Sequence, residues 1–209
     1  MKKRFLLFIS LFALSVILLS CTPFQEQIPN TKSNLDKETN PQEAKDIEVV
    51  ASNLDIPWEL VFLPTGEMLV TQRPGTLIKI SQEKKVIQVQ GVEHRGEGGL
   101  LGLALHPDFR QNSYIYLYLT TRLKDGLTNR VERYKLVSDT LTDKKIIIDN
   151  IPGASYHDGG RIVFGPDKML YITTGDAGNT QNSQDINSLA GKILRLNDNG
   201  TIPLDNPLG

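Results

Sequence analysis

The sequence has little of what marks several common classes of protein. Its single cysteine, Cys21, cannot form a disulfide within the chain, so the fold must rest on a hydrophobic core. Its three histidines are scattered and no cysteine pair accompanies them, which leaves no zinc-site spacing. The 23 Lys and Arg residues nearly balance the 24 Asp and Glu residues, and this charge indicates no nucleic-acid partner. What remains is ordinary globular composition, 39% hydrophobic and 22% charged.

The first 20 residues differ from the rest of the chain. They carry three positive charges, then an apolar run, which is the layout of a secretory signal peptide over residues 1–20 and too short for a membrane span. The run ends in Leu-Leu-Ser-Cys, which resembles the lipobox of bacterial lipoproteins. We therefore expect lipidation of Cys21, which would anchor the protein on the outer side of a bacterial membrane. The alternative is an incidental thiol near a cleavage site.

Beyond the signal peptide the chain changes texture at residue 48. Residues 21–47 are rich in Gln, Asn, Lys, Glu and Pro and have little to bury, which indicates a flexible linker. From residue 48, apolar runs alternate with turn residues, and no convincing long amphipathic helix interrupts them. We expect residues 48–209 to form one all-β domain. The expected strands are EMLVTQ, TLIKIS, KVIQVQ, YIYLYLT, RVERYKL, KIIIDN, RIVFG, MLYITTG and KILRLN.

A short pattern recurs within this domain. An apolar residue, one further residue, Pro, a polar turn and a strand ending near Thr begin at Phe62, Leu105 and Phe164, which are 43 and 59 residues apart. Periods of roughly 40–50 residues with several strands per unit are typical of β-propellers. At roughly 45 residues per blade, the domain has room for three to four blades. A β-sandwich with similar turns is the alternative fold.

The segment HRGEGGLLGLALHPDF, residues 94–109, is dense in glycine. It does not match the dinucleotide-binding pattern G-x-G-x-x-G, because Leu101 stands where the third glycine belongs. One interpretation is a tight turn between blades, in which the glycines adopt positive φ. The other is a backbone that closely approaches a flat ligand at the propeller axis, with Glu97 pointing at that ligand. The residues alone favour neither.

A histidine and an aspartate flank one predicted hairpin. His157 lies in YHDGGR and Asp176 ends TTGD, so an antiparallel return can bring them side by side. A carboxylate beside an imidazole fixes its tautomer and raises its basicity, which suits a general base. A histidine that serves only the turn is the alternative. His94 and His106 are weaker candidates, and we expect Arg195 to face solvent or an interface.

Four segments together resemble the glucose/sorbosone dehydrogenase family, in its soluble quinoprotein form. They cover about residues 50–209 in the family's order: IPWELVFLPTGEMLVTQRPGTLIKI, GEGGLLGLALHPDF, YHDGGRIVFGPDKMLYITTGDAGN and GKILRLNDNGTIPLDNP. The resemblance implies a six-bladed propeller that holds pyrroloquinoline quinone (PQQ) and calcium near its axis. This chain would be the N-terminal part of that propeller, truncated to three or four blades.

The resemblance also assigns roles to residues. His157 matches the histidine that removes the proton of the anomeric hydroxyl of an aldose while hydride passes to the quinone, which gives a lactone. Asp176 matches the partner of that histidine. Glu97 stands where the family often has Gln, and we expect it to contact cofactor or substrate together with Gly98 and Arg161. No metal ligand is expected in residues 1–209, because the family's calcium ligands and basic cofactor contacts lie later in the chain.

The expected function is therefore PQQ-dependent oxidation of aldoses, incomplete in this chain alone. A non-catalytic cell-surface propeller that binds sugars or proteins is the rival from another class. A partial chain that folds poorly is a third possibility.

Overall fold

The computed structural model describes residues 47–207. All the strands given below lie within the unit Val49–Gly209. The expected signal peptide, Cys21 and nearly all of the expected linker lie outside the described residues. Among the described residues, no helix is long and apolar enough to cross a membrane.

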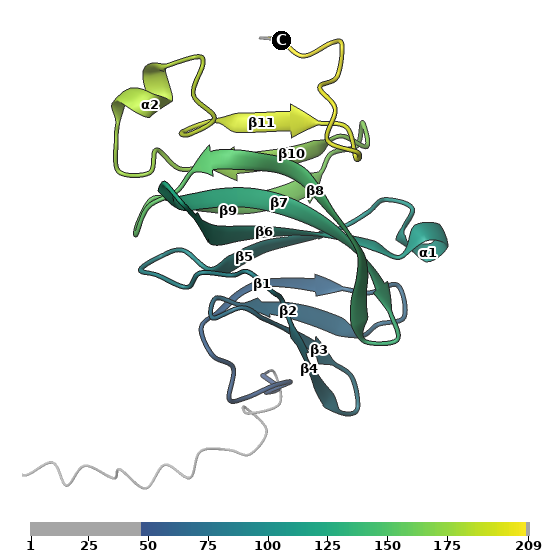
Figure 1. Ribbon diagram of the computed structural model, residues 1–209. Coiled ribbons are helices and arrows are strands. Elements are labelled where there is room, and N and C mark those ends of the chain that lie inside the picture. Colours follow the sequence, from purple (N-terminus) through teal and green to yellow (C-terminus); the bar gives the residue numbers. More distant parts are fainter. Residues whose placement is uncertain (1–46, 208–209) are drawn as a thin grey trace, which may run out of the picture. The chain divides into compact units, whose positions relative to one another are not determined.

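Eleven strands form three antiparallel sheets that follow one another along the chain (Figure 1). The first sheet has the order β1 (Pro57–Phe62), β2 (Met68–Gln72), β3 (Thr76–Ile80) and β4 (Lys84–Gln88). The second has the order β5 (Leu100–Leu105), β6 (Tyr114–Leu123), β7 (Gly126–Val137) and β8 (Thr140–Pro152). The third has the order β9 (Gly159–Phe164), β10 (Leu170–Thr174) and β11 (Ile193–Leu196). Two short helices, α1 (Phe109–Asn112) and α2 (Gln181–Gln184), lie in connecting loops.

Each sheet is a meander whose first strand lies next to the first strand of a neighbouring sheet. Strand β5 contacts both β1 and β9, so the three leading strands lie side by side with β5 in the middle. Successive antiparallel sheets with their leading strands together are the arrangement of propeller blades. The expected all-β fold of propeller type is therefore confirmed, with three sheets in the described part of the chain.

The inner strands β5 and β6 of the second sheet are buried on both faces of the sheet, to which successive side chains of a strand point in turn. On β6, Ile115 and Leu117 pack into the core shared with the first sheet. Their neighbours Tyr116 and Tyr118 pack into the core shared with the third sheet. All four side chains are fully buried. This explains why the run YIYLYL is apolar without alternation.

The sequence repeat marks the same hairpin in each sheet. Its three copies cover the turns from β1 to β2, from β5 to β6 and from β9 to β10. In the first and third copies, a threonine near the end of the copy stands opposite irregular pairing near the start of the leading strand. Thr71 Oγ1 accepts from Glu59 N at 3.0 Å, and Thr173 Oγ1 accepts from Arg161 N at 3.0 Å. The repeated threonine thus satisfies a backbone donor that the irregular pairing leaves free.

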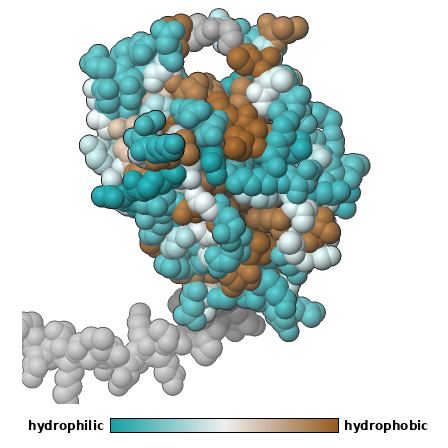
Figure 2. Space-filling view, in the orientation of Figure 1, coloured by the Kyte–Doolittle hydropathy of each residue, from teal (hydrophilic) through white to brown (hydrophobic). Residues whose placement is uncertain are grey.

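The face of the molecule drawn in Figure 2 is mostly hydrophilic, with hydrophobic side chains reaching it in separate patches. On the third sheet, Val163 is 54% exposed and Ile193 is 74% exposed. On the first sheet, Phe62 is 65% exposed. These residues belong to strands at the two ends of the series of sheets.

Candidate functional site

The site lies where two loops meet in front of the leading strands. One loop, residues 93–99, enters β5, and the other, residues 153–158, enters β9. Glu97 N donates to Ser155 O at 2.8 Å, and a side chain at Gly96 would collide with the same carbonyl. The glycine-rich segment therefore serves a close contact between two backbones. This contact brings Glu97 to His157.

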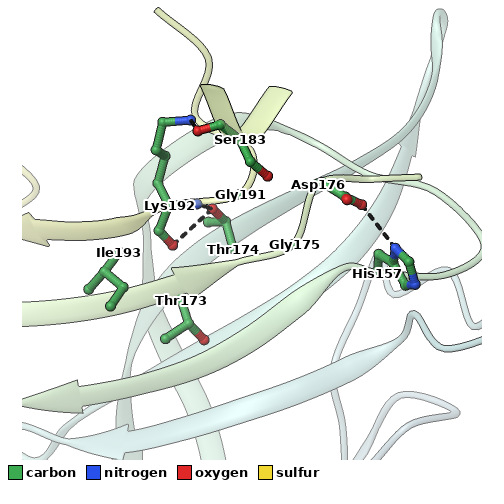
Figure 3. Close-up of a pocket in the computed structure, with 9 residues that line it drawn as sticks. All are labelled: His157, Thr173, Thr174, Gly175, Asp176, Ser183, Gly191, Lys192 and Ile193. Atoms are coloured by element: carbon green, nitrogen blue, oxygen red, sulfur yellow. Dashed lines mark hydrogen bonds and ion pairs between the residues drawn. The ribbon is translucent and has the colours of Figure 1, made fainter. Parts of the chain in front are cut away.

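His157 and Asp176 form the hydrogen-bonded pair that the hairpin predicted (Figure 3). Nδ1 of His157 lies 2.9 Å from Oδ1 of Asp176. The N–H of Gly178 and then His157 itself lower the pKa of the Asp176 carboxyl, which is therefore an ionised acceptor. We assign the ring proton to Nδ1, since a carboxylate accepts and cannot donate. This leaves the lone pair on Nε2, on a side chain that is 58% exposed.

The backbone of His157 is held in an uncommon conformation. Its φ is +60°, in the left-handed region that non-glycine residues seldom occupy. Three contacts hold it there. Glu97 Oε2 accepts from its N–H at 2.8 Å, its carbonyl accepts from Ala177 N at 3.1 Å, and Asp176 binds its ring. Surroundings that fix a strained residue so fully are common at functional sites.

Glu97 thus contacts the main chain of the histidine. We expected it to contact cofactor or substrate, and its Oε2 is the atom engaged here. Gly98 is buried, and a Cβ on it would lie 2.7 Å from Thr120 Oγ1 and 3.1 Å from Asp158 Oδ2. The absent side chain at residue 98 therefore makes room for these two polar groups.

Asp158 follows the histidine in the chain and is almost fully buried. Its Oδ1 accepts from Asn129 Nδ2 at 2.9 Å and from Ala154 N at 3.0 Å, and its carbonyl accepts from Tyr118 OH at 2.7 Å. Its Oδ2 has no hydrogen-bond partner among the described residues. Burial raises the pKa of the Asp158 carboxyl, and the negative charge of Glu97 adds to this rise.

Arg161 lies apart from the His157 pair. Its guanidinium makes an ion pair with Glu59 of β1 and stacks over the ring of Trp58, with Cζ 4.4 Å from the centroid. It therefore ties the third sheet to the first. Neither contact involves His157 or Glu97, so Arg161 does not join the cluster that the other expected site residues form.

The weaker candidates of the sequence have structural surroundings. His94 is exposed in its loop. His106 Nδ1 accepts from Asp108 N at 2.9 Å, and its Nε2 lies 3.3 Å from Asp198 Oδ2, so it fixes its turn. Arg195 was expected to face solvent or an interface. It instead forms the centre of a polar network, with contacts to Asp167, Asp205 and Asn206.

An open pocket of about 460 Å³ lies beside the pair. His157 and Asp176 stand at one side of it and Lys192 at the other, with Thr173 and Thr174 of β10 between them (Figure 3). No feature of the sequence singled out Lys192 or the loop before it. Lys192 contacts backbone carbonyls. Every residue has a carbonyl, so the residue types of the loop do not indicate these contacts.

The described residues do not make a complete seat for PQQ or calcium. They contain no group of three or more His, Cys, Asp or Glu side chains that could hold a metal ion. PQQ carries carboxylates, yet Glu97, Asp158 and Asp176 make the surroundings of His157 acidic. Lys192 is engaged by carbonyls and the more distant Arg161 by Glu59, whereas Arg73, whose charge acts on Asp158, has an Nε without a partner among the described residues. This part of the chain therefore fits a proton acceptor, and it does not form a complete seat for an anionic cofactor.

Comparison with known proteins places this geometry in a family. The family model described as glucose/sorbosone dehydrogenase matches residues 54–209. Quinoprotein glucose dehydrogenase B of Acinetobacter calcoaceticus is 32% identical over 99% of this chain and 50% of its own length. Aldose sugar dehydrogenase YliI of Escherichia coli is 37% identical over 77% of this chain and 46% of its own.

A solved structure agrees. The PQQ-bound aldose sugar dehydrogenase of Streptomyces coelicolor superposes with a TM-score of 0.73 at 39% identity, over 77% of this chain and 50% of that one. The chain thus spans about half the length of the relatives it matches. The extent of the family match and the shared fold lead to one conclusion: the chain belongs to the glucose/sorbosone dehydrogenase family.

Proposed function

We propose that this chain supplies the proton-accepting half of a PQQ-dependent aldose dehydrogenase that oxidises sugars to lactones. The observation that carries this proposal is the His157–Asp176 pair, with Nδ1 bound to the carboxylate and Nε2 free beside an open pocket. The names of the relatives, which are glucose and aldose sugar dehydrogenases, support the substrate class.

In this proposal His157 is the general base. Its Nε2 takes the proton of the anomeric hydroxyl, and the carboxylate of Asp176 stabilises the imidazolium that forms. The constraints on the His157 backbone keep the ring from turning away from the substrate. In the complete protein, PQQ would accept the hydride. PQQ and calcium would be held largely by residues other than those described here, because the described residues do not form a complete seat for them.

The test is to complete the propeller. We would join this chain to the C-terminal half of the E. coli relative and measure dye reduction with aldoses, PQQ and calcium. The completed protein should reduce dye, and His157→Ala should lower the rate by on the order of 10²–10⁴. Lys85→Ala, which removes an exposed lysine of β4 in the first sheet, is the control and should leave the rate unchanged.

Two results would count against the proposal. If the completed protein binds sugars but never reduces dye, a sugar-binding propeller describes it better. If it reduces dye and His157→Ala leaves the rate unchanged, the histidine serves only its turn.

We further propose that the protein is a lipoprotein anchored outside the cytoplasm through Cys21. The signal-type run that ends in Leu-Leu-Ser-Cys supports this. Two acyl signals are usually needed for stable anchoring by lipid. A fatty-acid probe fed to expressing bacteria should label the wild type, and equal labelling of Cys21→Ala would refute the proposal.

A further inference from the structure

The side chain of Lys192 ends in a cage of backbone carbonyls. Its Nζ lies 2.7 Å from Asn182 O, 2.9 Å from Ala190 O and 3.3 Å from Ser183 O. An ammonium group has three donors and no acceptor, so these three oxygens match its capacity. No carboxylate of the described chain forms an ion pair with it.

The carbonyls need such a partner. Asn182 and Ser183 belong to α2, whose last carbonyls have no partner inside the helix. Ala190 is fully buried, and an unpaired buried carbonyl is costly. One ammonium thus joins the middle of the loop between β10 and β11 to the end of the loop that precedes β11.

This loop carries Asp176. The side chain of Asn182 donates from Nδ2 to the carbonyl of Asp176 at 2.8 Å, while the carbonyl of Asn182 accepts from Lys192. At the other end, Gly191 N donates to Gly175 O at 2.7 Å. Two short routes therefore lead from the cage to the residue that orients His157.

We propose that Lys192 is a positioning residue for the His157–Asp176 pair, and that its carbonyl cage is a seat for an ammonium ion. The cage fixes the loop, the loop fixes the backbone of Asp176, and Asp176 fixes the tautomer of His157. The importance of this positioning for catalysis rests on the proposed role of His157. The geometry of the His157–Asp176 pair does not depend on that proposal.

Chemical rescue tests the proposal on the full-length chain. In Lys192→Ala the side chain and its charge are gone while the three carbonyls remain. Ring-nitrogen NMR of His157 should then change from one Nδ1–H tautomer to a mixture, and the pKa of Asp176 should rise toward its ordinary value. Addition of n-propylammonium, which restores N–H donors, should reverse both changes. Tetramethylammonium at equal ionic strength has no N–H donor and should not.

Two variants separate this role from a general loss of stability. Lys85→Ala removes an exposed lysine of β4 in the first sheet and should leave the His157 signals unchanged. Asn182→Ala cuts the side-chain link to Asp176 but keeps the cage. It should therefore perturb His157 as Lys192→Ala does, without rescue by propylammonium.

The proposal is overturned if folded Lys192→Ala keeps the wild-type tautomer of His157, or if propylammonium rescues no better than tetramethylammonium. Activity of the completed propeller gives a separate readout, where a misplaced base should lose on the order of 10²-fold in rate. If the NMR changes appear but dye reduction never depends on His157, the proposed function fails and the positioning role stands.

Discussion

His157 combines a strained backbone with a side chain whose orientation and tautomer are fixed by Asp176. A left-handed φ costs a non-glycine residue about 1–2 kcal/mol, and the neighbours of His157 must offset this. The sequence predicted the pairing with Asp176, because both residues flank a single hairpin. The contact from Glu97 to the backbone N–H was not predictable, since it joins loops of different sheets, 60 residues apart in the chain.

We therefore expect Glu97 to stabilise the fold through its acceptor oxygen and not through its charge. In Glu97→Gln the amide oxygen can still accept from His157 N–H, so we expect urea unfolding close to wild type. Glu97→Ala loses the acceptor and should destabilise the full-length chain by about 1 kcal/mol. Glu83→Ala, an exposed glutamate of the first sheet, is the control. Equal effects of Gln and Ala at residue 97 would show that the hydrogen bond is not what matters.

Asp158 should make stability fall as pH rises. The pKa of its carboxyl is raised in the folded protein, chiefly by burial, so the folded state holds its proton to higher pH than the unfolded chain does. The contribution is complete below the unfolded pKa and is lost as pH rises through the folded pKa.

We expect Asp158→Asn to gain stability relative to wild type as pH rises through the pKa of the Asp158 carboxyl in the folded protein, as measured by urea unfolding over a pH series. A difference between Asp158→Asn and wild type that stays constant with pH would mean that Asp158 ionises as freely in the folded protein as in the unfolded chain.

Two of the leading strands, β1 and β5, were not predicted from the sequence. Strand β1 begins at Pro57, and β5 follows a glycine-rich loop and contains Gly102, so both lack the usual strand pattern. Their irregular pairing with β2 and β6 follows from the same feature. The other strands were predicted, because side-chain alternation and turn residues are local signals.

Gly102 shows why β5 has this composition. A Cβ at this position would collide with the carbonyl of Gly160 on β9 and approach Ile162 Cγ1 to 3.1 Å. The glycine therefore allows the leading strands of the second and third sheets to lie close together.

Gly102→Ala should push these two sheets apart. Overpacking of this kind costs about 1–3 kcal/mol, which urea unfolding of the full-length chain would measure. The near-ultraviolet circular dichroism of the tyrosines packed between the sheets should change with it. A variant with wild-type stability and spectrum would show that the strands are not held at the distance described here.

The loop between β10 and β11 marks the limit of prediction for the site. Its sequence, rich in Asn, Gln and Ser, predicts only a loop. The contacts that matter there run from Lys192 Nζ to carbonyls, and any residue type has a carbonyl. Only the folded backbone shows that one lysine joins the middle of the loop to its C-terminal end.

At the scale of the whole molecule, the leading strands of the three sheets lie side by side. The candidate base lies in the loop that enters the leading strand of the third sheet. The second sheet contributes the loop with Glu97, and the third contributes His157 and Asp176. The repeat in the sequence predicted this propeller arrangement, because each copy marks the same hairpin. The match over about half the length of its relatives makes activity a property to test in a completed propeller.

The central claim is that this assembly delivers a histidine with a free Nε2. Ring-nitrogen NMR of His157 in the full-length chain, above the pH at which the ring titrates, tests it most directly. We predict a proton on Nδ1 and a bare, imine-like Nε2, and a mixture of tautomers in Asp176→Asn. A proton mainly on Nε2 in the wild type would contradict the claim, because that nitrogen could then accept nothing from a substrate.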